Sequence, residues 1–205
     1  MVQSIDGYLI NNASLEPWGF LLKDWIWVVE KYVTVCKGDA PYWYNERANT
    51  SMLAAAAWRS GFVAVEAYSD EKKVTAESEE IYKGRVDLWI GTSEEEWSIE
   101  TKYDGVNLKT LQASSQIEKT ILKAIDDIKR VRCNGGIGVG VAFIEPCIKK
   151  EEATNLDNDI QAFINMILPR QDHAIAWCFP KIVRQLEYKG CYYPGIILIA
   201  NVLDK

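Results

Sequence analysis

The segment 84–103 (GRVDLWIGTSEEEWSIETKY) alternates apolar and polar residues on both sides of a polar loop that starts with glycine. Alternation with a period of two predicts β-strands that bury one face. A polar, glycine-initiated loop at residues 91–96 predicts a hairpin between them. The residues predicted to point inward are Val86, Leu88 and Ile90 in the first strand, and Trp97, Ile99 and Thr101 in the second. The residues predicted to point outward are Arg85, Asp87 and Trp89, and Ser98, Glu100 and Lys102.

The register of this hairpin brings two acids together. A symmetric hairpin with Ile90 opposite Trp97 places Asp87 opposite Glu100. Opposed Cβ atoms in an antiparallel pair lie about 5 Å apart, and like charges at that distance destabilise the sheet. A divalent cation between the two carboxylates would remove this repulsion.

The same register also places Arg85 opposite Lys102, which leaves a second interpretation open. Arg85, Asp87, Glu100 and Lys102 could form a charge-balanced group of surface ion pairs, each worth about 0–1 kcal/mol, and such a group needs no metal. The sequence alone therefore allows both a metal site and a surface ion-pair network.

Composition limits the class of protein. A chain of 205 residues can bury a substantial core, and its 48% hydrophobic and 25% charged content is typical of a soluble globular domain. A net charge of −6 gives no global signal for nucleic-acid binding, although basic residues can still gather on one face. The five cysteines show no CxxC spacing, which predicts reduced core thiols. Without a signal-peptide pattern or a long apolar run, we expect a cytoplasmic protein that does not enter a membrane.

The rest of the chain alternates helical and strand patterns. Residues 1–14 and 70–83 are predicted to be loosely ordered or looped, with a short strand around Ile81, and residues 182–188 are ambiguous. A glycine-containing strand at 137–144 is expected to pack its backbone closely against a neighbour. Helices are predicted at 17–36 (rich in aromatic residues), 45–60, 108–132 and 157–168, and further strands at 62–69, 173–179 and 196–202.

Two glutamates outside the hairpin are candidates for the same site. Glu46 shares a helical face with Leu53, so it points inward, but it is also a first-turn acid of the kind that the helix dipole favours. Glu66 lies among apolar residues of a predicted strand. Both interpretations of Glu46 stay open.

Motifs that the sequence lacks exclude several classes of catalytic site. The single histidine, His173, rules out sites that need two histidines, and there is no GxSxG or Walker A motif. The remaining candidates are oxygen ligands, which suit Mg²⁺ or Mn²⁺. Such an ion would polarise a phosphoryl oxygen and activate a bound water.

Asp87 followed thirteen residues later by Glu100-Thr101-Lys102 resembles the D…(D/E)xK signature of the PD-(D/E)xK, or restriction-endonuclease-like, nuclease superfamily. The resemblance covers residues 45–145 and departs from the family at Val86, where its name expects proline. It implies an α/β fold with an αβββαβ core and a mixed central sheet flanked by helices. Residues 1–44 would be an N-terminal aromatic-rich helical extension, and residues 146–205 would add a helix and strands to one nuclease-like domain.

The resemblance also implies roles for individual residues. Asp87 and Glu100 would bind the metal, the Thr101 carbonyl would be a further ligand, Lys102 would be the catalytic lysine, and Glu46 would match a first-helix glutamate. Further candidates are Glu66, Gln112 and Gln116.

Three functions follow from these patterns. The first is a Mg²⁺- or Mn²⁺-dependent nuclease that hydrolyses phosphodiester bonds in DNA or, less well matched, in RNA; a homodimer would suit double-strand cutting. The second is a catalytically silent protein of the same fold that binds nucleic acid or a protein partner. The third is an interaction protein that uses the aromatic helix at 17–36 as its interface.

Overall fold

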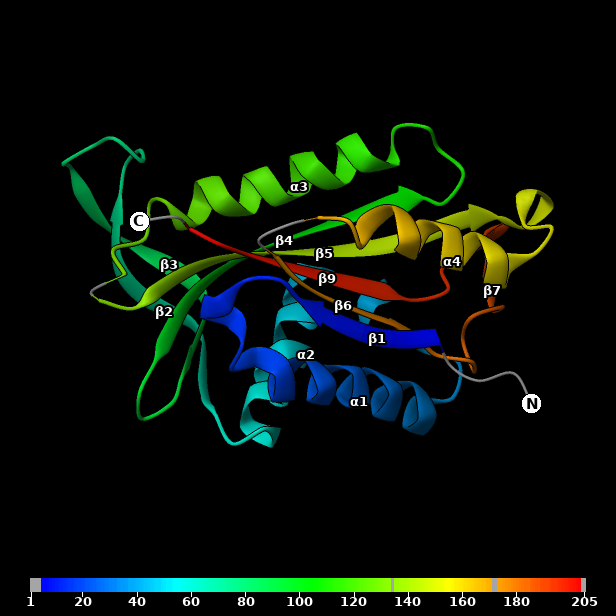
Figure 1. Ribbon diagram of the computed structural model, residues 1–205, viewed down its shortest axis with the longest axis horizontal. Coiled ribbons are helices and arrows are strands. Elements are labelled where there is room, and N and C mark those ends of the chain that lie inside the picture. Colours follow the sequence, from blue (N-terminus) through cyan, green and yellow to red (C-terminus); the bar gives the residue numbers. More distant parts are fainter. Residues whose placement is uncertain (1–4, 134, 171–172, 204–205) are drawn as a thin grey trace.

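The computed structural model describes residues 5–133, 135–170 and 173–203, and shows a mixed α/β protein built on one large sheet (Figure 1). The strand order is β1-β6-β9-β5-β4-β3-β2. β4 and β5 are parallel, and the other neighbours along this order are antiparallel. The predicted mixed α/β class and mixed central sheet are therefore confirmed.

The middle of the chain runs helix, three strands, helix, strand. The three strands form an antiparallel meander, and the second helix crosses over so that the last strand lies parallel to the third. These elements are α2 (Glu46–Arg59), β2 (Val63–Lys73), β3 (Ile81–Gly91), β4 (Glu96–Asn107), α3 (Ala113–Ile128) and β5 (Ile137–Lys149).

Elements from both ends of the chain complete the sheet. β1 pairs with β6, β6 with β9, and β9 with β5, while a small β7–β8 hairpin pairs with the end of β5. Their bounds are β1 (Ile5–Ile10), α1 (Trp18–Cys36), α4 (Leu156–Ile167), β6 (His173–Phe179), β7 (Glu187–Tyr188), β8 (Cys191–Tyr192) and β9 (Ile196–Val202), with short 3-10 turns at Ala13–Leu15, Pro41–Trp43 and Lys150–Glu152.

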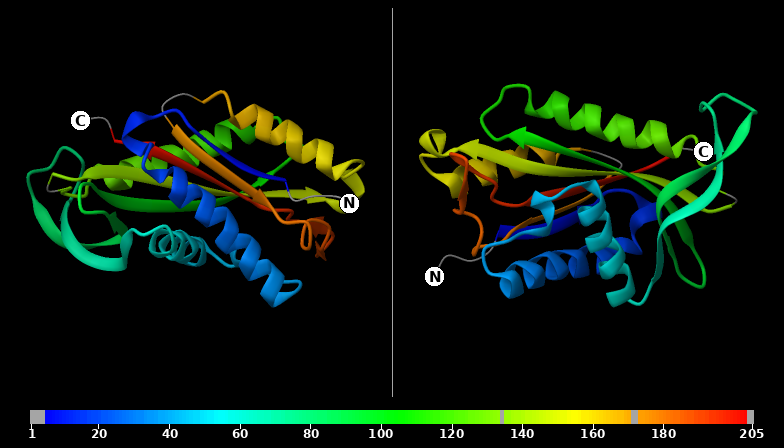
Figure 2. Two further views of the ribbon diagram at one scale, coloured as in Figure 1. Left: turned by 60° about the horizontal axis from the view of Figure 1, so that its bottom comes forward. Right: turned by 180° about the vertical axis from the view of Figure 1, so that it is seen from behind.

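The helices cover both faces of the sheet. α1 and α2 lie on one side, and α3 and α4 lie on the other (Figure 1). Each side has its own apolar cluster, one around the buried rings of Trp18, Trp25 and Trp97 and the other around Ile117, Ile160 and Phe163. The far ends of β2 and β3 project beyond the rest of the sheet (Figure 2).

Several local features of the fold follow from the sequence. The Asn45 side chain caps α2 by accepting a hydrogen bond from the backbone N of Ala48 at 3.0 Å. The aromatic helix α1 packs on the sheet, with Trp25 and Val29 buried. A Cβ at Gly140 would lie 2.9 Å from backbone atoms of α3, so this glycine does allow a close approach.

Two stretches predicted to be irregular are strands. Within 1–14, β1 pairs with β6 along its whole length. Within 70–83, β2 continues to Lys73 and β3 begins at Ile81. The strands within 70–83 were missed because most of their residues are charged and show no apolar alternation.

The helix predicted at 108–132 is shorter than expected. β4 runs on to Asn107, so α3 begins only at Ala113. Its buried face is formed by Ile117, Ile121, Ala124 and Ile128, whereas Leu111 and Leu122 are exposed. The predicted outward face of β4 is also wrong for Ser98 and Glu100, which are buried because α3 covers that side of the sheet.

Candidate functional site

The β3–β4 register agrees with the prediction, but the pairing stops one step before the two acids. Ile90 lies opposite Trp97 and Leu88 opposite Ile99, which is the last described pair. Past this point the Asp87 side chain turns to Thr101, and its Oδ2 accepts hydrogen bonds from the Thr101 N at 2.9 Å and Oγ1 at 3.0 Å. Asp87 therefore bonds to the strand beyond the ladder instead of forming a direct pair with Glu100.

The ladder on the other side of Asp87 is interrupted as well. In β2, Glu66 pairs with Leu88 and Tyr68 with Val86, and the register between them omits Ala67 and Asp87. Ala67 has a φ of 53°, the left-handed region that L-residues other than glycine rarely adopt. The register is the same on both sides of the gap, so no residue is inserted. The backbone is strained beside Asp87, as is common at functional sites.

Asp87 opens onto a cavity of about 190 Å³ between α2, β2 and β3. The predicted site residues that line it are Glu46, Glu66, Asp87 and Thr101. Thr50 on α2 also lines the cavity, and its hydroxyl is hydrogen-bonded to that of Thr101, with 3.1 Å between the two oxygens. Arg47 and Arg85 supply positive charge at the same cavity. The sequence did not single out Arg47, because an exposed arginine in the first turn of a helix carries no distinctive signal.

Glu100 lies on the α3 side of the sheet with a different partner. The side chain of Glu100 is 5% exposed, and its Oε1 lies 2.5 Å from the Lys72 Nζ. Burial raises the pKa of Glu100 to about 7, Lys72 opposes this rise, and the charge of Asp87 adds to it. Sequence reasoning missed Lys72 because it placed residues 70–83 in a loop.

Lys102 is likewise held by α3. Its Nζ lies 2.6 Å from the Asp127 Oδ2 and donates to the Thr101 carbonyl oxygen at 2.9 Å. Burial lowers the pKa of Lys102, but Asp127, Glu46 and Asp87 together outweigh that effect and raise it, so the ammonium is charged. The carbonyl proposed as a metal ligand therefore accepts a hydrogen bond from the proposed catalytic lysine.

Glu46 is half-buried, in agreement with its predicted inward direction. Its pKa is raised by burial, lowered by Lys102 and raised by Asp87. The backbone of Tyr103 also lowers this pKa. The carboxylates of Glu46, Asp87 and Glu100 and the ammonium of Lys102 are thus electrostatically linked, although they bond to separate partners.

The remaining candidates lie further from this group. The exposed Glu66 accepts a hydrogen bond from the Ser51 hydroxyl at 2.7 Å. Gln112 precedes α3 and is exposed, Gln116 is half-buried on α3, and neither lines the cavity.

Among the described residues, no group of three or more His, Cys, Asp or Glu side chains is arranged to hold a metal ion. The described helices include none that is long and apolar enough to span a bilayer. No family model matches the chain, and no curated protein or solved structure does either.

Proposed function

We propose that this chain is a divalent-metal-dependent nuclease with a restriction-endonuclease-like core that hydrolyses phosphodiester bonds in DNA. The observation that carries the proposal is the position of Asp87. It lies where the pairing of β3 is interrupted on both sides, and it shares a cavity with Glu46 and Thr101. The helix–three-strand–helix–strand order of residues 46–149 supports it.

The donor set fits Mg²⁺ or Mn²⁺, because both ions prefer oxygen ligands. Asp87 and Glu46 offer carboxylates at the cavity, Thr101 offers a backbone carbonyl, and Glu100 offers a third carboxylate once it leaves Lys72. When bound, the ion would polarise a phosphoryl oxygen of the substrate and activate a water molecule. A cation also suits this group because it would reduce the mutual repulsion that helps raise the pKa values of Glu46 and Glu100.

The basic side chains have separate roles in this proposal. Lys102 keeps a positive charge beside Glu46 and Asp87, where it would stabilise the negative charge that develops on the phosphate. Arg47 and Arg85 at the cavity would bind the neighbouring phosphates of the strand. This local positive charge allows nucleic-acid binding by a chain whose net charge is −6.

A second candidate is a protein of the same fold that binds DNA or a protein partner without cutting. The ion pairs Glu100–Lys72 and Lys102–Asp127 favour it, because they engage two of the proposed catalytic side chains. In the first proposal these pairs rearrange when the metal and substrate bind. In the second they are permanent.

The experiment is nicking of supercoiled plasmid with Mg²⁺ or Mn²⁺ and with EDTA. Asp87→Asn keeps an oxygen that can accept from Thr101 but removes the charge, and Lys102→Met removes the ammonium. We expect each variant to lose at least about 100-fold in rate. The matched control is Asp126→Asn on the exposed side of α3, which should cut at the wild-type rate. Salt-sensitive DNA binding without metal-dependent nicking would support the second candidate and contradict the first.

A further inference from the structure

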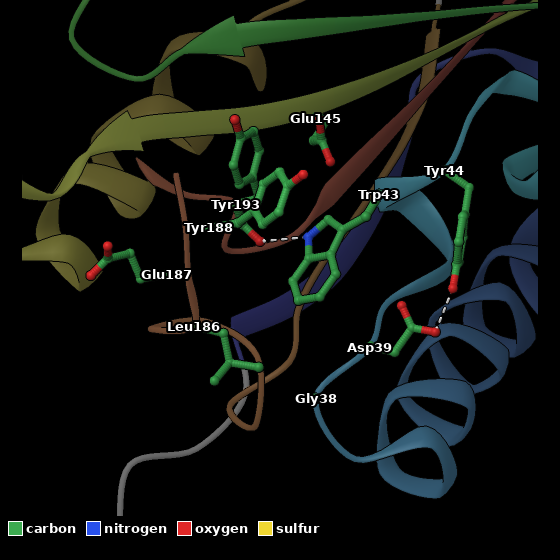
Figure 3. Close-up of a pocket in the computed structure, with 9 residues that line it drawn as sticks. All are labelled: Gly38, Asp39, Trp43, Tyr44, Glu145, Leu186, Glu187, Tyr188 and Tyr193. Atoms are coloured by element: carbon green, nitrogen blue, oxygen red, sulfur yellow. Dashed lines mark hydrogen bonds between the residues drawn. The ribbon is translucent and has the colours of Figure 1, made fainter. Parts of the chain in front are cut away.

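A cavity larger than the one at Asp87 lies elsewhere in the described part of the chain. It is a half-open cleft of about 600 Å³ between the α1–α2 connection and the segment that carries β7 and β8 (Figure 3). Four aromatic side chains line it, those of Trp43, Tyr44, Tyr188 and Tyr193. Neither lysine nor arginine is among its described lining residues. The cleft therefore suits a ligand with a flat or alkylated surface and without negative charge.

Glu145 on β5 is the acid at the base of this cleft. The residue is 7% exposed, and its Oε2 accepts a hydrogen bond from the Tyr103 hydroxyl at 2.7 Å. None of the ion pairs formed by the described residues includes Glu145. A carboxylate buried to this extent without a cation is costly. Burial accordingly raises the pKa of Glu145 to about 7.

The other two acids that line the cleft already have several hydrogen-bond donors or a cation as partners. Asp39 accepts hydrogen bonds from the hydroxyls of Tyr44 and Tyr32. Glu187 is paired with Lys150 at 2.7 Å and points away from the indole of Trp43 in Figure 3. Asp39 has three hydrogen-bond donors and Glu187 has a cation, whereas Glu145 has one neutral donor, so Glu145 has the most capacity left for a ligand.

The aromatic rings of the cleft also differ in whether they already contact a cation. The Lys189 ammonium lies 5.1 Å from the centroid of the Tyr188 ring, so that ring already has a cation. Trp43 is fixed because its Nε1 donates to the Tyr193 carbonyl oxygen at 3.2 Å, and Tyr42 packs edge-on against it. Trp43 and Tyr193 thus provide a rigid aromatic wall near Glu145.

We propose that this cleft binds a small organic amine, with its alkylated or protonated nitrogen held between the rings of Trp43 and Tyr193 and the Glu145 carboxylate. Aromatic faces attract cations, most strongly when the cation leaves water, and a buried carboxylate supplies the counter-charge. The absence of a lining cation in the described cleft disfavours phosphates and carboxylates as ligands. A volume of about 600 Å³ is in the range of small-molecule sites. This proposal does not depend on the nuclease function.

The ionisation of Glu145 makes the proposal sensitive to pH. Most other titratable side chains around it, on β4, β5 and the segments lining the cleft, have raised pKa values and are neutral near pH 7; these are Tyr42, Tyr103, Cys147 and Tyr193. The charged groups nearby are Asp39, Glu187 and Arg184, of which Arg184 is paired with Asp157. Amine binding should therefore weaken as the pH falls through about 7, because the carboxylate takes up a proton.

The test is calorimetric titration of the whole chain with choline and with 3,3-dimethylbutanol, which has the same shape without the charge. We expect choline to bind at least about tenfold more tightly, which is the effect of about 1.4 kcal/mol. Glu145→Gln should weaken choline binding by a similar factor, and the control Glu94→Gln, at an exposed acid that does not line the cleft, should leave it unchanged. Equal binding of the neutral analogue, wild-type binding by Glu145→Gln, or no binding of choline would overturn the proposal.

Two further measurements keep the test decisive. Trp43→Leu should weaken choline binding, and Trp43→Phe, which keeps a ring, should retain more of it; circular dichroism verifies that both variants fold. A peptide that carries trimethyllysine distinguishes the two sources of an alkylated nitrogen. Binding of choline supports a free amine, and binding of the peptide alone would overturn the small-molecule assignment.

Discussion

The Lys72 ammonium lies 2.5 Å from the Glu100 carboxylate, and both side chains are almost fully buried. The pair joins the outer half of β2 to the middle of β4, next to the candidate site. Removing one member of a buried ion pair leaves the other without its counter-charge. This pair therefore links the stability of the projecting hairpin to the charge of a proposed metal ligand.

Replacing Lys72 with Met should lower the free energy of unfolding by about 3–5 kcal/mol at a pH of about 8.5. The loss should be smaller at a pH of about 5.5, because Glu100, whose pKa burial already raises to about 7, takes up a proton and no longer carries an unpaired charge. Urea unfolding at both pH values measures the effect. Lys73→Met, on the neighbouring residue of β2, is the control and should cost much less. An equal loss at both pH values would contradict this account of Glu100.

Ala67→Gly should stabilise the protein by about 1 kcal/mol, because glycine removes the cost of a left-handed φ at a residue with a Cβ. Thermal unfolding measures the change. Ala64→Gly in the same strand, where the side chain is buried and the backbone is regular, should instead destabilise the protein. Destabilisation by both substitutions would show that the backbone at Ala67 is not strained.

Gly140→Ala should destabilise the protein by about 1–3 kcal/mol, because the added methyl group would lie 2.9 Å from the α3 backbone at Ala124 and Ile125. Gly105→Ala in β4 is the control, since its nearest neighbour would be 4.0 Å away. Chemical denaturation of both variants makes the comparison. Similar stability of the two would argue against close packing of α3 on β5.

Glu145→Gln should change how stability depends on pH. The pKa of Glu145 rises from 4.5 to about 7 on folding, so the folded state holds more protons between these values and loses stability as the pH rises. Glutamine carries no such charge. The variant should therefore match the wild type below pH 4.5 and exceed it by about 3 kcal/mol well above pH 7. Parallel pH profiles for the two proteins would contradict the burial of an ionised carboxylate.

The sequence was sufficient to predict those strands whose apolar pattern is local. The alternation in 84–103 predicted the strands and the pairing of Ile90 with Trp97, and the β6 and β9 segments were predicted with their observed bounds. The sequence did not predict the outer ends of β2 and β3, because the residues around Lys72 do not alternate between apolar and polar. The burial of Glu100 was also missed, because whether a helix covers a strand face is decided by tertiary packing.

Four of the predicted site residues lie together, but their geometry was not predictable. Glu46, Glu66, Asp87 and Thr101 line one cavity, as their shared prediction would require. The turn of Asp87 toward Thr101 depends on breaks in two ladders, and neither break has a signature in the sequence. The partners of Glu100 and Lys102 come from β2 and α3, so no spacing within the hairpin could predict them.

The most direct test of the central claim is anomalous diffraction from crystals soaked in Mn²⁺. The account predicts one strong peak in the cavity, within bonding distance of Asp87 and of Glu46 or the Thr101 carbonyl, and no such peak in crystals of Asp87→Asn. Wild-type crystals without a peak at Asp87, or with Mn²⁺ bound only to surface acids elsewhere, would contradict it.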